Sequence, residues 1–536
     1  MAARVDSGGA RAPEGAPERG RAWVERWWPA LVVAAIAAAG FALRAATFGD
    51  SLFGDELATE WTASRSGLGG VIDAVRSEQE LTPPLYYLLA SLTREIGDPL
   101  ASVRLPSLLA GTLAIPLVYL LGARTVSRPA ALVGTALFAL NQFLIFHSVE
   151  ARAYMLALLG VLLATLALLE ALSSGRRVWW VGYAALSALC LYAHYTTAFT
   201  LVVLAAWALW AHPRRWRALA LANAAAALAF LPWIGAWLDD ARSPLAEINA
   251  TLAPFTFERS IDEWVRLAVG RPQAGLGSVV GDASLLLVAL GFAIAALGLA
   301  IAVVRGRLSV GRPDPRSGPV LLVALAVAAP LGAALFSALG NDILIGRNIS
   351  ASLPYVALLA GALLAAETVV ALRTAACVLA LAGFAIAAVG MLDPERRRPD
   401  YEGVASFIDA STNPGAPILD FPPPSPGPPT ELEVEVARLG EPHPVLRLGF
   451  RPLSPGPMTP ERMFRAPADP ELVTRGAIRE AGDGDLALVQ SGFSIGGALA
   501  GEGVRERLAE AFGPPRERRT FAGVAPVEVE IYGAEP

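Results

Sequence analysis

Long apolar runs constrain the fold of this chain more than any other feature. Eleven of them approach or reach the roughly 20 residues that a membrane-spanning helix needs. Hydrophobic residues make up 54% of the 536 positions and charged residues only 17%, against about 25% charged in soluble domains. The sequence therefore predicts an α-helical polytopic membrane protein. The predicted spans are 28–48, 105–123, 129–146, 153–172, 178–193, 197–211, 218–238, 284–304, 318–340, 353–372 and 374–392.

The distribution of arginine predicts the orientation of these spans. The apolar stretch 83–96 is too short to cross and contains Arg94 and Glu95, which suits an interfacial or re-entrant helix. If it does not cross, one set of alternate loops holds little beyond Arg152 and Arg347, and the positive-inside rule places the other set in the cytoplasm. The N-terminus is then cytoplasmic and the C-terminus extracytoplasmic. The arginines of the cytoplasmic set are Arg124, Arg128, Arg176, Arg177, Arg214, Arg215, Arg217, Arg305, Arg307, Arg312, Arg316 and Arg373.

Composition changes along the chain predict three regions. Residues 1–28, rich in Arg, Gly, Pro and Ala, are typical of a disordered cytoplasmic tail, and 29–392 form the membrane domain with a first external loop at 49–104. Residues 393–536 are predicted to form a soluble extracytoplasmic α/β domain. Its expected strands are 416–421 and 527–532, its expected helices 401–410 and 502–512, and its Pro-rich loop 422–429.

The chain has no lysine, so any basic contact to an anion comes from arginine, which can bind phosphate with two parallel hydrogen bonds. Abundant Ala, Arg, Gly and Pro indicate a GC-rich, bacterial source. Cys190 and Cys377 lie in apolar runs and are interpreted as small buried hydrophobic residues, so neither a disulfide framework nor a cysteine metal site is available. The net charge of −5 gives no indication of nucleic-acid binding.

Ionisable and aromatic residues recur in the predicted external loops. Asp55 and Glu56 follow the first span, where acidic residues also favour the start of any helix. The segment from Glu80 continues through Pro83-Pro84 to Tyr86 and Tyr87, which could equally be an interfacial anchor.

Two further external turns carry charge. Residues 147–154 contain Glu150, Arg152 and Tyr154, and the alternative there is a local Glu150–Arg152 pair. Arg347, in 341–348, and Arg104, at the mouth of the second span, are candidates to hold a lipid phosphate, or else snorkelling arginines. Ionisable residues at membrane depth are functional-site candidates by default, so carboxylates and arginines converging on one face predict a site there.

This arrangement resembles the GT-C superfamily, and within it glycosyltransferase family 39, which includes protein mannosyltransferases and lipid A aminoarabinose transferases. The motifs that carry the resemblance are the external Asp-Glu pair, Pro-Pro-Leu-Tyr-Tyr at 83–87, and Arg-Leu-Pro-Ser-Leu-Leu-Ala-Gly at 104–111. The turn Val-Glu-Ala-Arg-Ala-Tyr at 149–154 and Arg-Pro-Asp-Tyr-Glu-Gly-Val-Ala at 398–405 fit the bacterial members. The resemblance covers roughly residues 30–405, and the C-terminal domain lies outside it.

The resemblance implies inverting transfer of a sugar from a polyprenyl phosphate to an acceptor hydroxyl or amine. It implies Asp55 as the general base, Glu56 as its motif neighbour and Glu150 as the second acidic position. Thr82 stands where many relatives have His or Lys, which is a departure from the family's pattern. The expected substrate-binding residues are Arg104, Tyr86, Tyr87, Arg152, Tyr154 and Arg347.

The chemistry of such a transfer needs a cationic clamp on the phosphate that leaves and a base for the attacking group. No cofactor is implied, although a divalent cation held by Asp55 or Glu150 could assist. The alternatives are a membrane transporter and a non-catalytic glycan-binding protein of the same fold. Against a transporter, most ionisable residues fall at loop ends, with Glu170 and Glu367 as exceptions.

Overall fold

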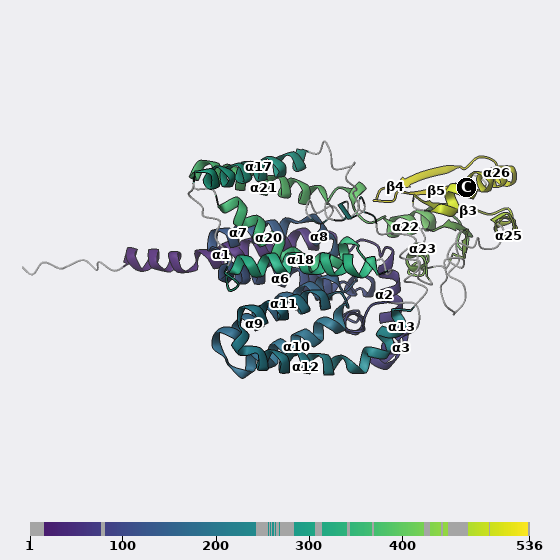
Figure 1. Ribbon diagram of the computed structural model, residues 1–536. Helices are drawn as coiled ribbons and strands as arrows, with labels where there is room; N and C mark the ends of the chain where they lie inside the picture. Colours follow the sequence, from purple (N-terminus) through teal and green to yellow (C-terminus); the bar gives the residue numbers. More distant parts are fainter. Residues whose placement is uncertain are drawn as a thin grey trace, which may run out of the picture.

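The computed structural model describes residues 16–76, 81–242, 283–305, 314–339, 343–366, 369–422, 429–440, 443–448, 470–492 and 494–533, together with single positions between 256 and 267. A bundle of long helices makes up most of it, and a small sheet domain lies at one end (Figure 1). The long helix that opens the chain leads away from the other end. The predicted fold class, a polytopic helical protein with a C-terminal α/β domain, is confirmed.

The helices of the bundle follow the apolar runs of the sequence. They are α1 Ala16–Ala45, α6 Leu105–Thr125, α7 Arg128–Leu140, α8 Gln142–Ser148, α9 Tyr154–Ser174, α10 Arg177–Ala193, α11 Thr197–Ala211, α12 Trp216–Phe230, α13 Ile234–Asp240, α17 Ala283–Val304, α18 Gly318–Ala338, α19 Gly346–Ile349, α20 Leu353–Ala365 and α21 Val370–Gly390. Between α1 and α6 lie four short helices, α2 Asp55–Ala63, α3 Gly67–Arg76, α4 Leu85–Thr93 and α5 Pro99–Ser102.

Eight helices in the described part of the chain are long and apolar enough to cross a membrane, or nine if the bent pair α7–α8 is one span. The predicted count of eleven also includes α10 and α11, which have 17 and 15 residues. Helix α4, within the stretch predicted not to cross, has nine residues. Near the N-terminus, α1 begins at Ala16, so part of the segment 1–28 that was expected to be disordered is helical.

A break between α7 and α8 sets up one of the site's turns. The two helices meet at 57°, and Asn141 at the break accepts a hydrogen bond from the Leu144 N–H at 3.1 Å. The Asn141 amide also donates to the Leu267 carbonyl at 3.0 Å. A short polar side chain that binds nearby backbone favours such a helix start. Helix α8 consequently ends at Ser148, directly before the turn that carries Glu150.

The predicted charge asymmetry corresponds to two opposite ends of the bundle. Helix α6 begins beside the acidic loops and ends at Thr125, where Arg124 pairs with Glu170 at 3.4 Å. At that same end, Arg316 donates to the Ala211 carbonyl at 3.1 Å. Several loops of the arginine-rich set therefore meet at the end away from the sheet domain. Their cytoplasmic location remains a prediction.

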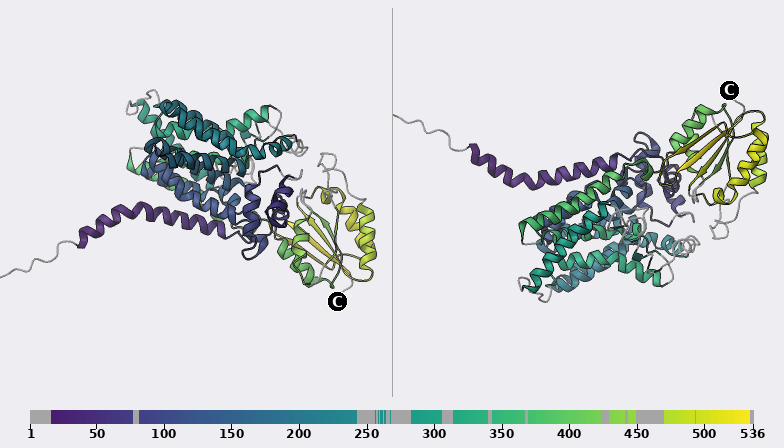
Figure 2. Two further views of the ribbon diagram at one scale, coloured as in Figure 1. Left: turned by 90° about the horizontal axis from the view of Figure 1, so that it is seen from below. Right: turned by 90° about the horizontal axis from the view of Figure 1, so that it is seen from above.

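The C-terminal domain is a five-stranded sheet with helices on both faces (Figure 2). Strand order is β2-β1-β3-β5-β4, with β1, β2 and β3 parallel and β5 antiparallel to both of its neighbours. Alternation along β3 sends Ala487 and Val489 to one face and Leu486 and Leu488 to the other, so each face has its own apolar core. The elements are α22 Tyr401–Ser411, β1 Ile418–Phe421, α23 Glu431–Val436, β2 Val445–Arg447, α25 Pro470–Ala481, β3 Leu486–Ser491, α26 Ile495–Phe512, β4 Glu517–Phe521 and β5 Val527–Tyr532.

Both predicted strands and both predicted helices of this domain are present, and α26 begins earlier than 502. Most of the predicted loop 422–429 lies outside the described residues. Helices α22 and α23 cover the face of the sheet nearer the bundle (Figures 1 and 2).

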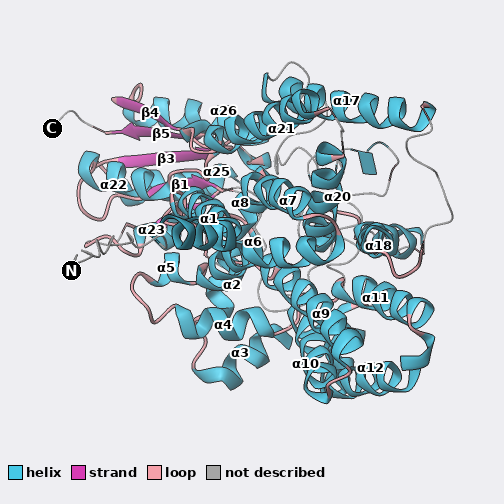
Figure 3. Ribbon diagram, turned by 90° about the vertical axis from the view of Figure 1, so that its left-hand side faces the viewer, coloured by secondary structure: helices cyan, strands magenta, loops and turns pink. Residues whose placement is uncertain are grey.

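Glycines allow α7 and α20 to pack closely inside the bundle (Figure 3). A Cβ on Gly134 would lie 2.7 Å from the Ala357 carbonyl oxygen, and one on Gly361 would collide with backbone atoms of Ala130 and Gly134. Small residues at helix contacts are the usual means of close approach in membranes.

Gly361→Ala is expected to destabilise the bundle by about 1–3 kcal/mol, because the backbone has to move to admit the methyl group. Thermal unfolding of the purified chain in detergent measures this as a Tm lower by several degrees. Gly182→Ala is the matched control, since a Cβ at that helical position meets nothing within 4 Å. Equal Tm values for both variants would contradict the packing argument.

Candidate active site

The candidate site lies at the end of the bundle that faces the C-terminal domain. Helix α2 opens it, beginning at Asp55 directly after Gly54, whose φ of 61° favours glycine. Successive residues of a helix point about 100° apart, so Asp55 and Glu56 face different surroundings. Asp55 lines a cavity, whereas Glu56 is 1% exposed and points into the protein.

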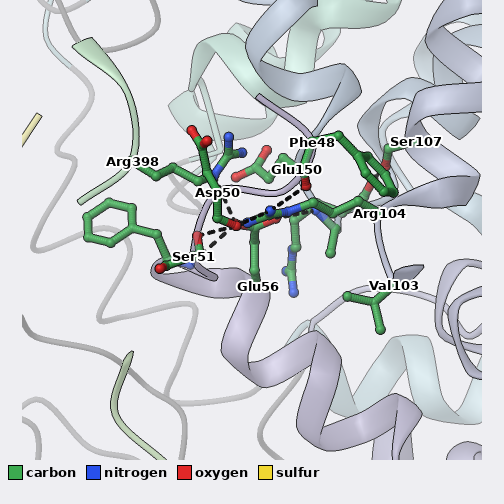
Figure 4. Close-up of polar contacts among 12 residues, drawn as sticks. Phe48, Asp50, Ser51, Glu56, Val103, Arg104, Ser107, Glu150 and Arg398 are labelled. Atoms are coloured by element: carbon green, nitrogen blue, oxygen red, sulfur yellow. Dashed lines mark hydrogen bonds and ion pairs between the residues drawn. The ribbon is translucent and has the colours of Figure 1, made fainter. Parts of the chain in front are cut away.

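Glu56 is the centre of a buried ion-pair network (Figure 4). The Arg104 guanidinium donates to both of its oxygens, at 2.7 Å each, and Arg398 Nε donates at 3.0 Å. The Ala151 N–H donates at 2.8 Å. Burial opposes ionisation of Glu56, but Arg104 and Arg398 outweigh it and lower its pKa to about 2. The network joins the first loop, the start of α6, the turn at 150–151 and the segment after α21.

Arg104, which was expected to hold phosphate, is fully buried. Besides Glu56, its guanidinium donates to the carbonyls of Phe48 at 2.9 Å, Ser51 at 2.9 Å and Asp50. These contacts use all its nitrogens within the protein. The structure therefore places Arg104 among groups that hold the first loop.

Asp55 pairs with Arg347 across 292 positions of sequence. Arg347 Nη1 donates to Asp55 Oδ2 at 2.8 Å, and the two side chains are 28% and 34% exposed. Burial raises the pKa of Asp55, but the charges of Arg347 and Arg152 outweigh it, so the pKa lies below its ordinary value. Asp55 is accordingly a carboxylate at neutral pH.

Glu150 pairs with His147. The two residues lie on one turn, and His147 Nδ1 is 2.5 Å from Glu150 Oε2. Aromatic rings surround the imidazole, with the ring centroids of Phe143 at 4.2 Å and Tyr154 at 5.5 Å. The acidic turns at 55 and 150 thus meet at one end of the bundle, as the sequence analysis required, because the backbone after Glu150 binds Glu56.

Two cavities meet at Arg347. The small cavity has a volume of about 260 Å³, and its walls include Asp55, His147, Glu150, Glu263 and Arg398. The large cavity, of about 430 Å³, has mostly apolar walls with Arg152, Tyr154 and His194 among them. Arg347 and Ile345 line both. A cation at the boundary separates an apolar space from a polar one.

The remaining predicted residues divide between the large cavity and its support. Arg152 lines the cavity and is held by the Tyr87 hydroxyl at 3.1 Å, with Thr82 Oγ1 at 3.4 Å. Tyr154 lines the same cavity, and its ring centroid lies 5.8 Å from Arg347 Cζ. Tyr86 is buried and donates to the Val103 carbonyl at 3.0 Å, so it lines neither cavity.

Four residues of the cavities were not selected from the sequence. His147 stands in the quoted turn and Arg398 in the quoted 398–405 motif, so a signal existed for both. His194 follows α10, and its ring centroid lies 5.5 Å from that of Tyr154. Glu263 accepts a hydrogen bond from the Gly346 N–H at 2.6 Å, and no sequence pattern marks it. Among the described residues, no group of three or more His, Cys, Asp or Glu is placed to hold a metal ion.

Comparison with known proteins agrees with this architecture. Residues 82–237 match the family model for dolichyl-phosphate-mannose-protein mannosyltransferase, which is less than half of the chain. No curated protein matches in sequence. Among solved structures, ArnT from Cupriavidus metallidurans in the apo state is 16% identical with a TM-score of 0.52, and the alignment covers 96% of this chain and 100% of ArnT. The fold is therefore GT-C-like.

The predicted resemblance to GT-C proteins is thereby confirmed. The alignment with ArnT extends over nearly the whole chain and so includes the C-terminal domain, which the resemblance in sequence did not reach. A second similar structure is the oligosaccharyltransferase of Archaeoglobus fulgidus, at 15% identity and a TM-score of 0.44, covering 72% of this chain and 57% of that one.

The C-terminal domain contacts the first loop of the GT-C fold directly. Glu431 accepts a hydrogen bond from the Gly54 N–H at 3.1 Å, next to Asp55, and the Glu402 N–H donates to Ser51 Oγ at 3.0 Å. Burial and the proximity of Glu431 raise the pKa of Asp420, and burial raises that of Glu431 as well. Both acids therefore bind protons more tightly in the folded protein than in the unfolded chain.

Stability of the full chain is therefore expected to be highest in mild acid and to fall as pH rises from about 5 to about 8, because over that range the folded protein keeps protons on these two acids that the unfolded chain has already released. Tm measured over that range tests the sign. Asp420→Asn with Glu431→Gln mimics the protonated acids and should flatten the slope. An unchanged slope in the double variant would exclude these two groups as its source.

Glu56→Gln is expected to lower stability far more than Asp55→Asn. The first change leaves two buried arginines without their carboxylate, a loss of about 3–5 kcal/mol, whereas a partly exposed pair contributes about 0–1 kcal/mol. Thermal unfolding of the two variants side by side measures the difference. Similar Tm values would show that the network is not what holds this end of the protein.

Proposed function

We propose that this chain is an inverting glycosyltransferase that moves a monosaccharide from a polyprenyl-phosphate donor to an extracytoplasmic acceptor, either a glycolipid, a cell-wall glycan or a protein. The observation that carries the proposal is the Asp55–Arg347 pair at the boundary of the two cavities. It puts a base and a phosphate-binding cation side by side, with an apolar space on one side and a polar space on the other. The proposal places the site at the outer face of a bacterial plasma membrane, with the N-terminus in the cytoplasm.

The large cavity suits the lipid phosphate of such a donor. Apolar side chains such as Phe199, Phe230 and Phe336 give it the walls that a polyprenyl chain needs. Arg152 and Arg347 supply planar guanidinium groups for phosphate oxygens. The matching family model is described by a donor of this kind, dolichyl-phosphate-mannose.

The transfer itself needs few protein groups. The acceptor oxygen or nitrogen attacks the anomeric carbon, while the bond from that carbon to the phosphate oxygen breaks on the opposite side. The electron pair goes to the phosphate, where Arg347 and Arg152 stabilise the developing charge, so no general acid is required. Asp55 takes the proton that the acceptor loses.

The ion pair with Arg347 prepares Asp55 for this role. A base has to be ionised before the reaction, and the depressed pKa of Asp55 ensures that it is. When a donor phosphate binds Arg347, the arginine divides its charge between two anions. The pKa of Asp55 then rises toward its ordinary value, and the carboxylate becomes a stronger base only when donor is present.

The other acidic and aromatic residues act around this centre. Glu150, with His147, lines the small cavity and is proposed to bind the acceptor or the sugar. Tyr154 borders the phosphate position, and Tyr87 orients Arg152. Glu56, Arg104 and Tyr86 line neither cavity and are proposed to position the first loop.

Asp55→Asn is expected to lower the transfer rate at least 100-fold, the usual contribution of a general base. The assay presents purified enzyme in detergent with a panel of undecaprenyl phosphates carrying single sugars and follows release of undecaprenyl phosphate. Asp73→Asn is the matched control, because Asp73 is exposed on α3 at the same end of the protein. It should retain full activity.

Wild-type activity in Asp55→Asn would remove Asp55 from the mechanism. A complete lack of turnover by the wild type with every sugar-bearing lipid and every acceptor extract would instead favour the transporter or glycan-binding alternatives.

A further inference from the structure

Arg398 reaches the small cavity from outside the membrane domain. It lies between α21 and α22, on the segment that leads into the C-terminal sheet. Its Nε binds Glu56 at 3.0 Å, and its guanidinium lies over the Phe146 ring, 4.5 Å from the centroid. The side chain is 3% exposed and forms part of the cavity wall with Asp55 and Glu150.

One nitrogen of this guanidinium, Nη2, is buried and has no hydrogen-bond partner among the residues that the structure describes. Such a donor is costly to leave unpaired, and in native proteins its occurrence calls for an explanation. Burial lowers the pKa of Arg398 in spite of Glu56, which shows that its charge is not fully compensated. A ligand in the cavity, against the part of the guanidinium that lines it, would compensate this charge.

The walls of the small cavity select the chemistry of that ligand. Asp55, Glu150 and Glu263 contribute carboxylates, which would repel a second anion but accept hydrogen bonds from hydroxyl groups. Arg398 contributes donors, which hydroxyl oxygens accept. A ligand with many hydroxyls can satisfy both kinds of wall. The volume of about 260 Å³ is below the roughly 300–1,000 Å³ of pockets for drug-sized molecules, as a single sugar requires.

We propose that the Arg398 guanidinium donates a hydrogen bond to a hydroxyl oxygen of the sugar on the lipid donor, and that it thereby helps to select the sugar. This inference rests on the proposed function, because it takes the phosphate to lie at Arg347 and the sugar to lie beyond it in the small cavity. Arg398 is then a donor-specificity residue supplied by the segment that carries the C-terminal domain.

The attachment of this segment makes the contact depend on docking of the C-terminal domain. Arg397 pairs with Asp50, and the Val524 N–H donates to the Arg397 carbonyl at 2.9 Å. Together with the Glu431–Gly54 bond, these contacts fix both ends of the segment against the first loop and the sheet domain. The sugar subsite is therefore complete only when the domain is in place.

The test uses the full chain in nanodiscs. It compares binding of undecaprenyl phosphate with binding of the sugar-bearing undecaprenyl phosphates of the same panel. Arg398→Gln is expected to weaken binding of the preferred sugar-bearing donor by roughly 10- to 100-fold, as for the loss of a hydrogen bond from an ionised group. Binding of undecaprenyl phosphate without a sugar should stay within twofold of the wild type. Arg347→Gln, the phosphate control, should weaken both.

Arg398→Lys keeps a positive charge beside Glu56 but has a single nitrogen, so it can pair with Glu56 without also reaching the sugar. It therefore distinguishes an effect on folding from the loss of the sugar contact. It should unfold at nearly the wild-type temperature and show the same selective loss. Equal weakening of both lipids by Arg398→Gln would make Arg398 a phosphate contact, and no change in either would make it structural; both outcomes overturn the inference. If the wild type binds no sugar-bearing lipid more tightly than undecaprenyl phosphate alone, the proposed function itself fails.

Discussion

The site depends on one buried carboxylate and the cations around it. Glu56 holds Arg104 and Arg398 and accepts from the backbone of Ala151, so four segments far apart in sequence share one charge. Removing a charge from water is costly unless the charge is paired, and loss of Glu56 would leave both arginines buried without a carboxylate. The positions of the first loop, the turn at Glu150 and the segment after α21 are therefore set jointly.

The same network explains why two neighbouring acids differ in character. Glu56 has every oxygen engaged inside the protein and a pKa of about 2, so it is permanently ionised and unavailable to a ligand. Asp55, one residue earlier, has a single arginine partner, which also lines both cavities. An ion pair that a third group can enter is the arrangement on which the proposed reaction depends. Rotation by about 100° per helical residue produces the division.

Much of this could be predicted from residue types, and the limits have a physical origin. Apolar runs predicted the bundle, and the turns at 55, 150 and 347 converge as expected, because charged residues at helix ends have to share the few polar places available. The sequence does not show whether the hydrogen-bond donors of an arginine are already used by other groups of the protein. Arg104 and Arg347 looked equivalent in sequence, yet carbonyls of the first loop use up the donors of Arg104, and this depends on tertiary packing. Arg398 stood in a quoted motif, but only the fold shows that it reaches back to Glu56.

The C-terminal domain consequently contacts the loop that carries Asp55. Its acids Asp420 and Glu431 carry raised pKa values, and Glu431 binds the backbone of Gly54 immediately before Asp55. The hydrogen bond from Gly54 to Glu431 therefore couples docking of the domain to the geometry of the loop that carries Asp55. Arg398 extends that coupling into the cavity wall. Binding of a ligand against Arg398 and docking of the domain must then stabilise each other by equal amounts, since coupling between two equilibria is reciprocal.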